Sequence, residues 1–340
     1  MPRTVDNPRG FHYKQANFEE AGMSFRSLTA VAALTLGVSL PAGGAAQEPA
    51  LPPGAVALSL FGRPLVPPSP APVARQALEQ RLAEARAAAE KDPASADALI
   101  WLGRRTAYLG RYREAIAIYS QGVERHPGDA RFYRHRGHRY ITTRRFDRAV
   151  HDFERAAALV AGKADEIEPD GQPNPRNVPT STLQFNIWYH LGLARYLRGE
   201  FAQALAAYER CLDVSKNPDS QVATRHWLYM TLRRLDRAAD AAKVLEPVTA
   251  GMEILENGAY HRLLLMYKGE ADADALLAGA AAGLDRATVG YGVGNWHLYH
   301  GRQDRALAIF RDVVATDQWA SFGAIAAEAD LARLGAGPSR

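Results

Sequence analysis

Residues 102–119 read LGRRTAYLGRYREAIAIY, and residues 136–153, which lie 34 positions later, read RGHRYITTRRFDRAVHDF. Three kinds of position recur at this interval: Gly103 as Gly137, Ala115 as Ala149, and Tyr119 as Phe153. They return at Gly192, Ala204 and Tyr208 after 34 residues plus an insertion of 21, and the alanine returns again at Ala238 and Ala306. A repeat of this length predicts a solenoid of two-helix units, a class of fold that presents a binding surface rather than a reaction centre.

The repeated positions resemble the tetratricopeptide repeat family, whose pattern is W-x2-L-G-x2-Y, then A-x3-F, then P. Five units carry parts of this pattern: Leu102, Gly103, Gly110, Ala115, Tyr119 and Pro127; Tyr133, Gly137, Tyr140, Ala149, Phe153 and Ala156; Trp188, Leu191, Gly192, Gly199, Ala204 and Tyr208; Tyr229, Leu235 and Ala238; and Gly294, Gly301, Ala306 and Phe310. The resemblance covers residues 96 to about 318. It departs from the family at Arg136, where leucine is usual, and in a fifth unit of irregular spacing, where we expect a long helix A over residues 254–268.

Packing explains why these residue types recur. Each unit is expected to be a helix A followed by a helix B, and a glycine within helix A costs about 1 kcal/mol relative to alanine. That cost is tolerable where the facing helix has to approach closely. The recurring alanines begin helix B beside helix A, and the aromatic residues four positions later fill the core. The predicted fold class is therefore all-α: an α-solenoid of five or six tetratricopeptide-type helix pairs with capping helices.

The first 46 residues have the composition of an export signal preceded by extra residues. Arg26 follows Met23 closely, residues 28–40 are apolar, and small residues continue to Ala46. The apolar run is too short for a membrane span, which needs about 20 residues. We expect translation to start at Met23 and cleavage to follow Ala46. Because no cysteine follows the run, the sequence predicts a periplasmic or secreted protein without a lipid anchor.

The remaining chain divides into a Pro-rich extended segment, 47–73, and a solenoid, 74–335. Proline favours extended chain, but residues 56–66 are apolar, so we expect them to pack on the solenoid. Helices over residues 74–91 and 319–334 are expected to cap its two ends. An insertion at about 161–181 carries Asp165, Glu166, Glu168 and Asp170. Its spacing does not fit a calcium-binding hand. We expect a solvated loop beside the binding face, where insertions in solenoids often lie.

The sequence offers few candidates for chemistry. His135 and His138 share a helix face, but zinc needs three or four converging ligands, so no metal site is predicted. Motifs for nucleophilic catalysis and for phosphate or cofactor binding are missing from the sequence, and the protein is predicted not to be an enzyme and to need no cofactor. The single cysteine, Cys211, is expected to be a small buried hydrophobe.

A basic run spans residues 131–148, with seven arginines and two histidines against one acid, Asp147. It is either a solvated helix pair or part of a binding wall. The resemblance implies that the A helices form a concave wall, which gives a predicted groove of Arg104, Arg131, Arg134, His135, His138, Asn186, Tyr189, His190, Trp227, Tyr291 and Asn295. We expect Arg131 and Arg134 to share an exposed helix face. The family's clamp for C-terminal carboxylates is not reproduced, since Ile100 and Arg104 occupy its first-repeat sites.

Arginines and aromatic residues in a groove suit carboxylates, phosphates and extended peptides. The predicted function is that of an exported scaffold that binds a protein or peptide, and the arginines of the groove are compatible with an acidic partner. The alternative is binding of an anionic envelope glycan or phosphate-bearing ligand in the same groove, and a third hypothesis is an enzyme that uses the histidine-bearing face. A peptide requires apolar pockets beside Trp227 and Tyr189. The formal net charge of +4 is too small to indicate nucleic acid, and no membrane span is predicted.

Overall fold

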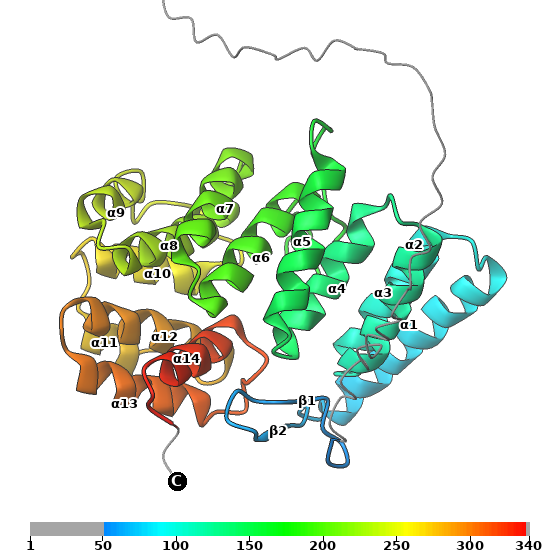
Figure 1. The fold of residues 1–340 in the computed structure, drawn as a ribbon, viewed down its shortest axis with the longest axis horizontal. Helices are drawn as coiled ribbons and strands as arrows, with labels where there is room; N and C mark the ends of the chain where they lie inside the picture. The colour runs from blue at the N-terminus through cyan, green and yellow to red at the C-terminus, as the bar shows by residue number, and fades with distance from the viewer. Residues whose placement is uncertain (1–50, 338–340) are drawn as a thin grey trace, which may run out of the picture. The chain divides into compact units, whose positions relative to one another are not determined.

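The computed structural model describes residues 51–337, which form an α-solenoid (Figure 1). Helix α1 (Pro72–Lys91) precedes six consecutive pairs, each an A helix followed by a B helix. The pairs are α2 (Ala96–Tyr108) and α3 (Tyr112–Arg125), α4 (Ala130–Thr142) and α5 (Phe146–Val160), α6 (Leu183–Arg198) and α7 (Phe201–Val214), α8 (Pro218–Arg234) and α9 (Ala238–Leu245), α10 (Gly258–Tyr267) and α11 (Ala273–Ala278), and α12 (Leu284–Tyr299) and α13 (Gln303–Val314). Helix α14 (Phe322–Arg333) follows. The predicted all-α fold class is confirmed.

The repeated residues pack as their types require. A Cβ atom placed on Gly103 would lie 2.3 Å from the ring of Tyr119, and one on Gly192 would lie 2.7 Å from Tyr208. The A helix can therefore approach the aromatic side chain of its B helix only because the position is glycine. Four of the five recurring alanines are fully buried in the first turn of a B helix: Ala115, Ala149, Ala204 and Ala306. The fourth unit differs from the predicted register, because Ala238 is exposed and Ala241 takes the buried position in α9.

The described chain begins with a small hairpin rather than a plain extended segment. Strand β1 (Ala57–Leu58) pairs antiparallel with β2 (Pro64–Leu65). Ala57 and Leu65 are buried against Trp319, whose Nε1 donates a hydrogen bond of 2.9 Å to the carbonyl of Val66. The expectation that residues 56–66 pack on the solenoid is confirmed. Figure 1 shows the hairpin beside the C-terminal helices.

Helix α14 does more than cap the end of the solenoid. It packs on α12 and α13, and it also contacts α6 of the third pair. Its first residue, Phe322, lies 5.4 Å from the ring of His138 and 5.5 Å from that of His190, between ring centres. Farther along, Glu328 forms an ion pair of 2.7 Å with Arg144 from the α4–α5 turn. The C-terminal helix thus closes back onto the second and third pairs.

The fifth pair is shorter than expected. The predicted helix A over 254–268 is wrong in its extent, because α10 begins only at Gly258. The cause is Asp219, whose carboxylate accepts hydrogen bonds of 2.8–2.9 Å from the backbone N–H groups of Leu255, Glu256 and Asn257. Those residues are held in a loop outside the helix. Its partner, α11, has only six residues.

Several predictions from the sequence concern residues 1–46, and these lie outside the described residues: the start at Met23, the export signal and its cleavage. Within residues 51–337, no helix has both the length and the apolar character needed to cross a membrane. The same residues contain no group of three or more metal-ligating side chains placed to hold an ion. Cys211 is buried, as expected.

Candidate binding groove

The A helices and α14 line three adjoining hollows, which together are called the groove below. The largest, here called the open chamber, has a volume of about 650 Å³ and is bordered by Tyr260, Leu284 and Phe322. The second, the strapped chamber, has a volume of about 310 Å³, and a deeper hollow of about 130 Å³ adjoins it. His138 borders all three hollows, which therefore lie side by side.

The open chamber combines an apolar lining with a charged edge. It lies at the first turns of α10, α12 and α14. Leu284 keeps 62% of its surface exposed there, beside the aromatic rings of Tyr260 and Phe322. Arg262 and Asp285 form an ion pair at the edge. Such a surface suits an apolar side chain flanked by polar main chain.

The insertion between α5 and α6, residues 161–182, crosses the other half of the groove, and it is called the strap below. Its base is closed by an isolated antiparallel bridge between Ile167 and Thr182. Two backbone hydrogen bonds support this base: Glu168 N to the carbonyl of Ser181 at 3.2 Å, and Leu183 N to that of Glu166 at 2.8 Å. The strap is therefore an ordered part of the groove wall, while most of its residues are exposed to solvent, as expected from its composition.

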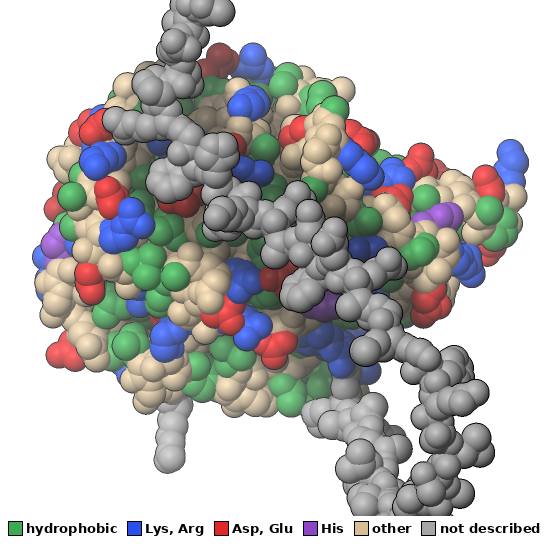
Figure 2. Space-filling model, turned by 45° about the horizontal axis from the view of Figure 1, so that its top comes forward, with side chains coloured by type: hydrophobic (Ala, Val, Ile, Leu, Met, Phe, Trp, Pro, Cys, Tyr) green, Lys and Arg blue, Asp and Glu red, His purple; other side chains and the backbone are tan. Residues whose placement is uncertain are grey.

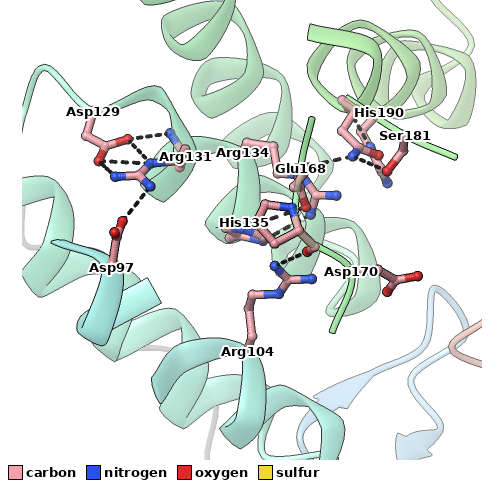
Figure 3. A network of polar contacts seen from close by, with 12 residues as sticks. Asp97, Arg104, Asp129, Arg131, Arg134, His135, Glu168, Asp170, Ser181 and His190 are labelled. Atoms are coloured by element: carbon pink, nitrogen blue, oxygen red, sulfur yellow. Dashed lines mark hydrogen bonds and ion pairs between the residues drawn. The ribbon is translucent and has the colours of Figure 1, made fainter. Parts of the chain in front are cut away.

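The acidic end of the strap lies on the arginines of α2 and α4 (Figure 3). The carboxylate of Glu168 is 2.9 Å from Nε of Arg134 and accepts a hydrogen bond of 3.1 Å from Asn186. Arg104 donates to the carbonyl of Pro169 at 2.7 Å. The chain itself thus places a carboxylate and a backbone carbonyl in the groove.

The far end of the strap is fastened to the loop that precedes α10. Asn174 and Thr180 donate to the carboxylate of Glu256 at 2.6 Å and 2.7 Å, and Arg176 pairs with Glu253. All of these contacts are exposed to solvent. The strap therefore spans the groove from the first two pairs to the fifth.

The positive charge of the groove comes from arginine rather than histidine. Burial, followed by nearby arginines, lowers the pKa of His135 and His138 well below the ordinary value, and burial does the same for His190. Arg134 lies 3.0 Å from Nδ1 of His135, which must accept the hydrogen bond and so carries no proton. Elsewhere charges are mixed: on the face shown in Figure 2, basic and acidic side chains are interspersed.

Seven of the predicted groove residues come together in the strapped chamber and the deeper hollow: Arg104, Arg134, His135, His138, Asn186, Tyr189 and His190. All seven lie on A helices, as the repeat register requires. Arg134, which was expected on the surface, is 8% exposed because the strap covers it.

Arg131 lies apart from this group. Its guanidinium is 2.6 Å from Asp129 and 2.6 Å from Asp97, in a separate hollow near Gly128. Asp129 caps α4 by accepting a hydrogen bond from the backbone N–H of Arg131, and its carboxylate also accepts hydrogen bonds from the Arg131 guanidinium. The two arginines, three positions apart, do not share an exposed face.

Three other predicted residues, Trp227, Tyr291 and Asn295, lie in the core between helices. Trp227 stacks on Tyr291 with ring centres 5.8 Å apart, and its Nε1 donates to the hydroxyl of Tyr189 at 2.8 Å. Asn295 accepts a hydrogen bond of 2.7 Å from Arg234. They support the groove wall from behind.

Four groove residues were not predicted from the sequence: Glu168, Tyr260, Phe322 and Leu284. The insertion next to the binding face was a signal for Glu168. No sequence signal indicated Phe322, because its helix was expected to cap the end of the solenoid. It reaches His138 because α14 folds back onto the second and third pairs.

Residues 185–218 match the family model described as tetratricopeptide repeat. Solved structures with similar folds include YrrB, described as a TPR protein with an unusual peptide-binding site (16% identity, 68% of this chain and 90% of that chain, TM-score 0.40). Others are a tetratricopeptide repeat protein from Parabacteroides merdae (15%, 76% and 94%, 0.45) and the TPR-like repeats of a putative kinesin light chain from Podosopora anserina (15%, 67% and 96%, 0.38). No curated protein matches the sequence. At these identities the likeness concerns the fold alone.

Proposed function

The chain is a tetratricopeptide repeat protein, and from this premise we propose that it is a scaffold that binds an extended segment of a partner protein in its groove. The observation that carries the proposal is the strap, an extended segment of the chain itself that lies in the strapped chamber with its carboxylate and carbonyl groups bonded to A-helix side chains. A groove that holds a peptide in cis has the chemistry to hold one in trans.

We also propose that the partner is a peptide rather than a glycan. The open chamber supplies the apolar surface that a peptide requires, with Leu284, Tyr260 and Phe322 exposed to the groove. Tyr189, one of the two residues beside which such a pocket was expected, lines the adjoining chamber. Arginine next to this apolar surface favours an acidic segment with at least one hydrophobic side chain.

Export of the protein is a further part of this proposal. It is supported by the arginine, apolar and small-residue pattern that ends at Ala46. Expression in a Gram-negative host, followed by N-terminal sequencing, should give a chain that begins at or near Gln47. A cytoplasmic product that keeps Met1 contradicts export and leaves the binding proposal intact.

Site-specific photo-crosslinking tests the binding proposal. A photoreactive phenylalanine analogue at Leu284 faces the open chamber, and the same analogue at Gln203 lies exposed on α7, a B helix. When cells that make each variant are irradiated, position 284 should give crosslinked products of defined mass, and position 203 should give no product of the same mass. Equal adducts from both positions would show that contact does not depend on the groove.

A further inference from the structure

Four consecutive residues of the strap meet the groove as a bound peptide would. They are Glu168, Pro169, Asp170 and Gly171. The side chain of Glu168 is 9% exposed and contacts Arg134 and Asn186, both of which are buried. This contact selects for an acidic residue, because it is made to a side-chain carboxylate rather than to the main chain.

The next contacts read the backbone. Arg104 donates to the carbonyl of Pro169 at 2.7 Å, and Arg105 donates to the carbonyl of Gly171 at 2.9 Å. Both guanidinium groups lie over the ring of Trp101, at 4.5 Å and 4.7 Å from its centre. Cation–π contact with one indole holds the two donors in place before a ligand arrives.

The last contact selects glycine. A Cβ atom on Gly171 would lie 2.0 Å from the hydroxyl oxygen of Tyr108. Any other residue at this position would have to displace the tyrosine or leave the groove. The site therefore recognises three groups of an extended segment: the side-chain carboxylate of one residue, the backbone carbonyl of the next residue, and the backbone carbonyl of a glycine three positions after the acidic residue.

We propose that the strap occupies the position of the partner in cis, and that the partner presents the same chemistry: an extended Glu-Pro-x-Gly segment or its close equivalent. This inference rests on the proposed function and adds to it a recognition motif and a mode of regulation. A tethered segment acts at an effective concentration in the millimolar range. The partner has to displace the strap, so its apparent affinity is its intrinsic affinity multiplied by the fraction of time that the strap is out of the groove.

The exposed fastening of the strap fits such an exchange. Ile167, at its base, is 66% exposed, and Val178 is 44% exposed. The side chains of Asn174, Arg176 and Thr180 hold the far end through solvent-exposed polar contacts, which are individually weak. One half-buried hydrogen bond of 2.9 Å, from Asn217 to the carbonyl of Thr180, adds to them. The strap can leave the groove without uncovering a large apolar core of its own.

Fluorescence anisotropy with a synthetic peptide tests the proposal. The probe is a fluorescein-labelled peptide of residues 164–175, ADEIEPDGQPNP. The receptor is the full chain with Glu168→Ala and Gly171→Ala, which empty the site while keeping every receptor side chain. The probe should bind this variant and not the wild type at the same concentration. Probe peptides with Glu168→Gln or Gly171→Ala should bind about ten- to hundredfold more weakly than the unaltered probe. The first loses a charge-assisted contact with Arg134 and Asn186, and the second places a Cβ atom against the hydroxyl group of Tyr108.

Two outcomes would overturn the proposal: no binding of the probe to a natively helical variant, or binding of the two altered peptides that is as tight as that of the unaltered probe. If the double variant loses its helical circular dichroism, the isosteric Glu168→Gln variant takes its place in the same titration. Adducts from position 284 together with failure of the probe would keep the proposed function and remove this inference, because Leu284 borders the open chamber and not the strapped one.

Discussion

Two arginine–glutamate contacts, one next to α4 and one on it, join parts of the chain that are far apart in sequence, and they differ in what surrounds them. Arg144 pairs with Glu328 of α14 at 2.7 Å, and both side chains are almost wholly buried. Arg134 pairs with Glu168 of the strap at 2.9 Å, and both are about one-tenth exposed. We call the first contact the clasp.

The clasp is embedded in the fold on every side. Glu328 also accepts a hydrogen bond from the backbone N–H of Leu60 in the hairpin, and Arg144 donates to the carbonyl of Trp319 at 2.8 Å. Three separate segments therefore meet on one ion pair. Glu168, by contrast, is carried by a strap whose neighbouring Ile167 is exposed. The comparison indicates that the clasp fixes the solenoid, whereas the strap covers the groove and can be exchanged.

The largest expected effect comes from breaking the clasp. Glu328→Ala leaves Arg144 buried without its partner charge and removes the acceptor for the hairpin N–H of Leu60. We expect the free energy of unfolding to fall by about 3–5 kcal/mol. Urea denaturation followed by circular dichroism measures it. The matched control is Glu79→Ala, which removes an exposed ion pair with Arg75 on α1 and should cost less than about 1 kcal/mol. Similar costs for both variants would refute the distinction.

A fall in pH should destabilise the packing around the strapped chamber at a higher pH than it destabilises the clasp. Burial lowers the pKa of His138 and His190 below 6.5, so these imidazoles stay neutral when folded and bind protons when unfolded. Stability therefore falls as the pH drops below 6.5, by about 1.4 kcal/mol per pH unit for each histidine, until the folded pKa is reached. The clasp residues include no imidazole.

Hydrogen exchange at pH 7 and pH 5, corrected for the intrinsic rate, separates the two regions. The strap and the first turn of α14, where Phe322 contacts both histidines, should lose protection at pH 5 while the hairpin keeps it. Replacing His138 with phenylalanine should weaken the pH dependence. Equal loss of protection in the hairpin would contradict the assignment.

The regular part of the fold was predictable because its contacts are local. Gly103 and Tyr119 lie on two helices of one pair, and the same contact recurs wherever the pattern recurs, as with Gly192 and Tyr208. The period in the sequence thus encodes the helix order, the tight approach of each pair, and the wall on which Arg104 and Arg134 lie. Seven of the groove residues followed from this register alone.

The remainder depends on contacts that no period encodes. Arg144 and Glu328 are 184 positions apart, and nothing in either local sequence indicates their pairing. Trp227 was predicted in the groove for the same reason. The repeat register correctly puts it on an A helix, but its burial depends on Tyr291 of α12, which is distant in sequence. Arg131 was misplaced because its helix-capping neighbour Asp129 competes for the side chain.

Breaking the strap contact should cost less than breaking the clasp. Glu168→Ala removes the carboxylate from Arg134 and Asn186, but the strap can swing out and let water reach the guanidinium. We expect a loss of about 1–3 kcal/mol in the free energy of unfolding, together with faster hydrogen exchange confined to residues 161–182. A loss as large as that of Glu328→Ala would mean that the strap is as fixed as the clasp.

The smallest effect is expected at the far end of the strap, where Arg176 pairs with Glu253. Their side chains are 59% and 76% exposed, so solvent already screens the interaction. Arg176→Ala should change the free energy of unfolding by less than about 0.5 kcal/mol. It should still speed exchange at residues 172–180, because it removes one of the four polar contacts that hold this end. The other three are those of Asn174 and Thr180 with Glu256 and that of Asn217 with the carbonyl of Thr180. If global stability fell by more than 1.5 kcal/mol, the far end would be a structural anchor, and a partner would have to enter the groove without moving it.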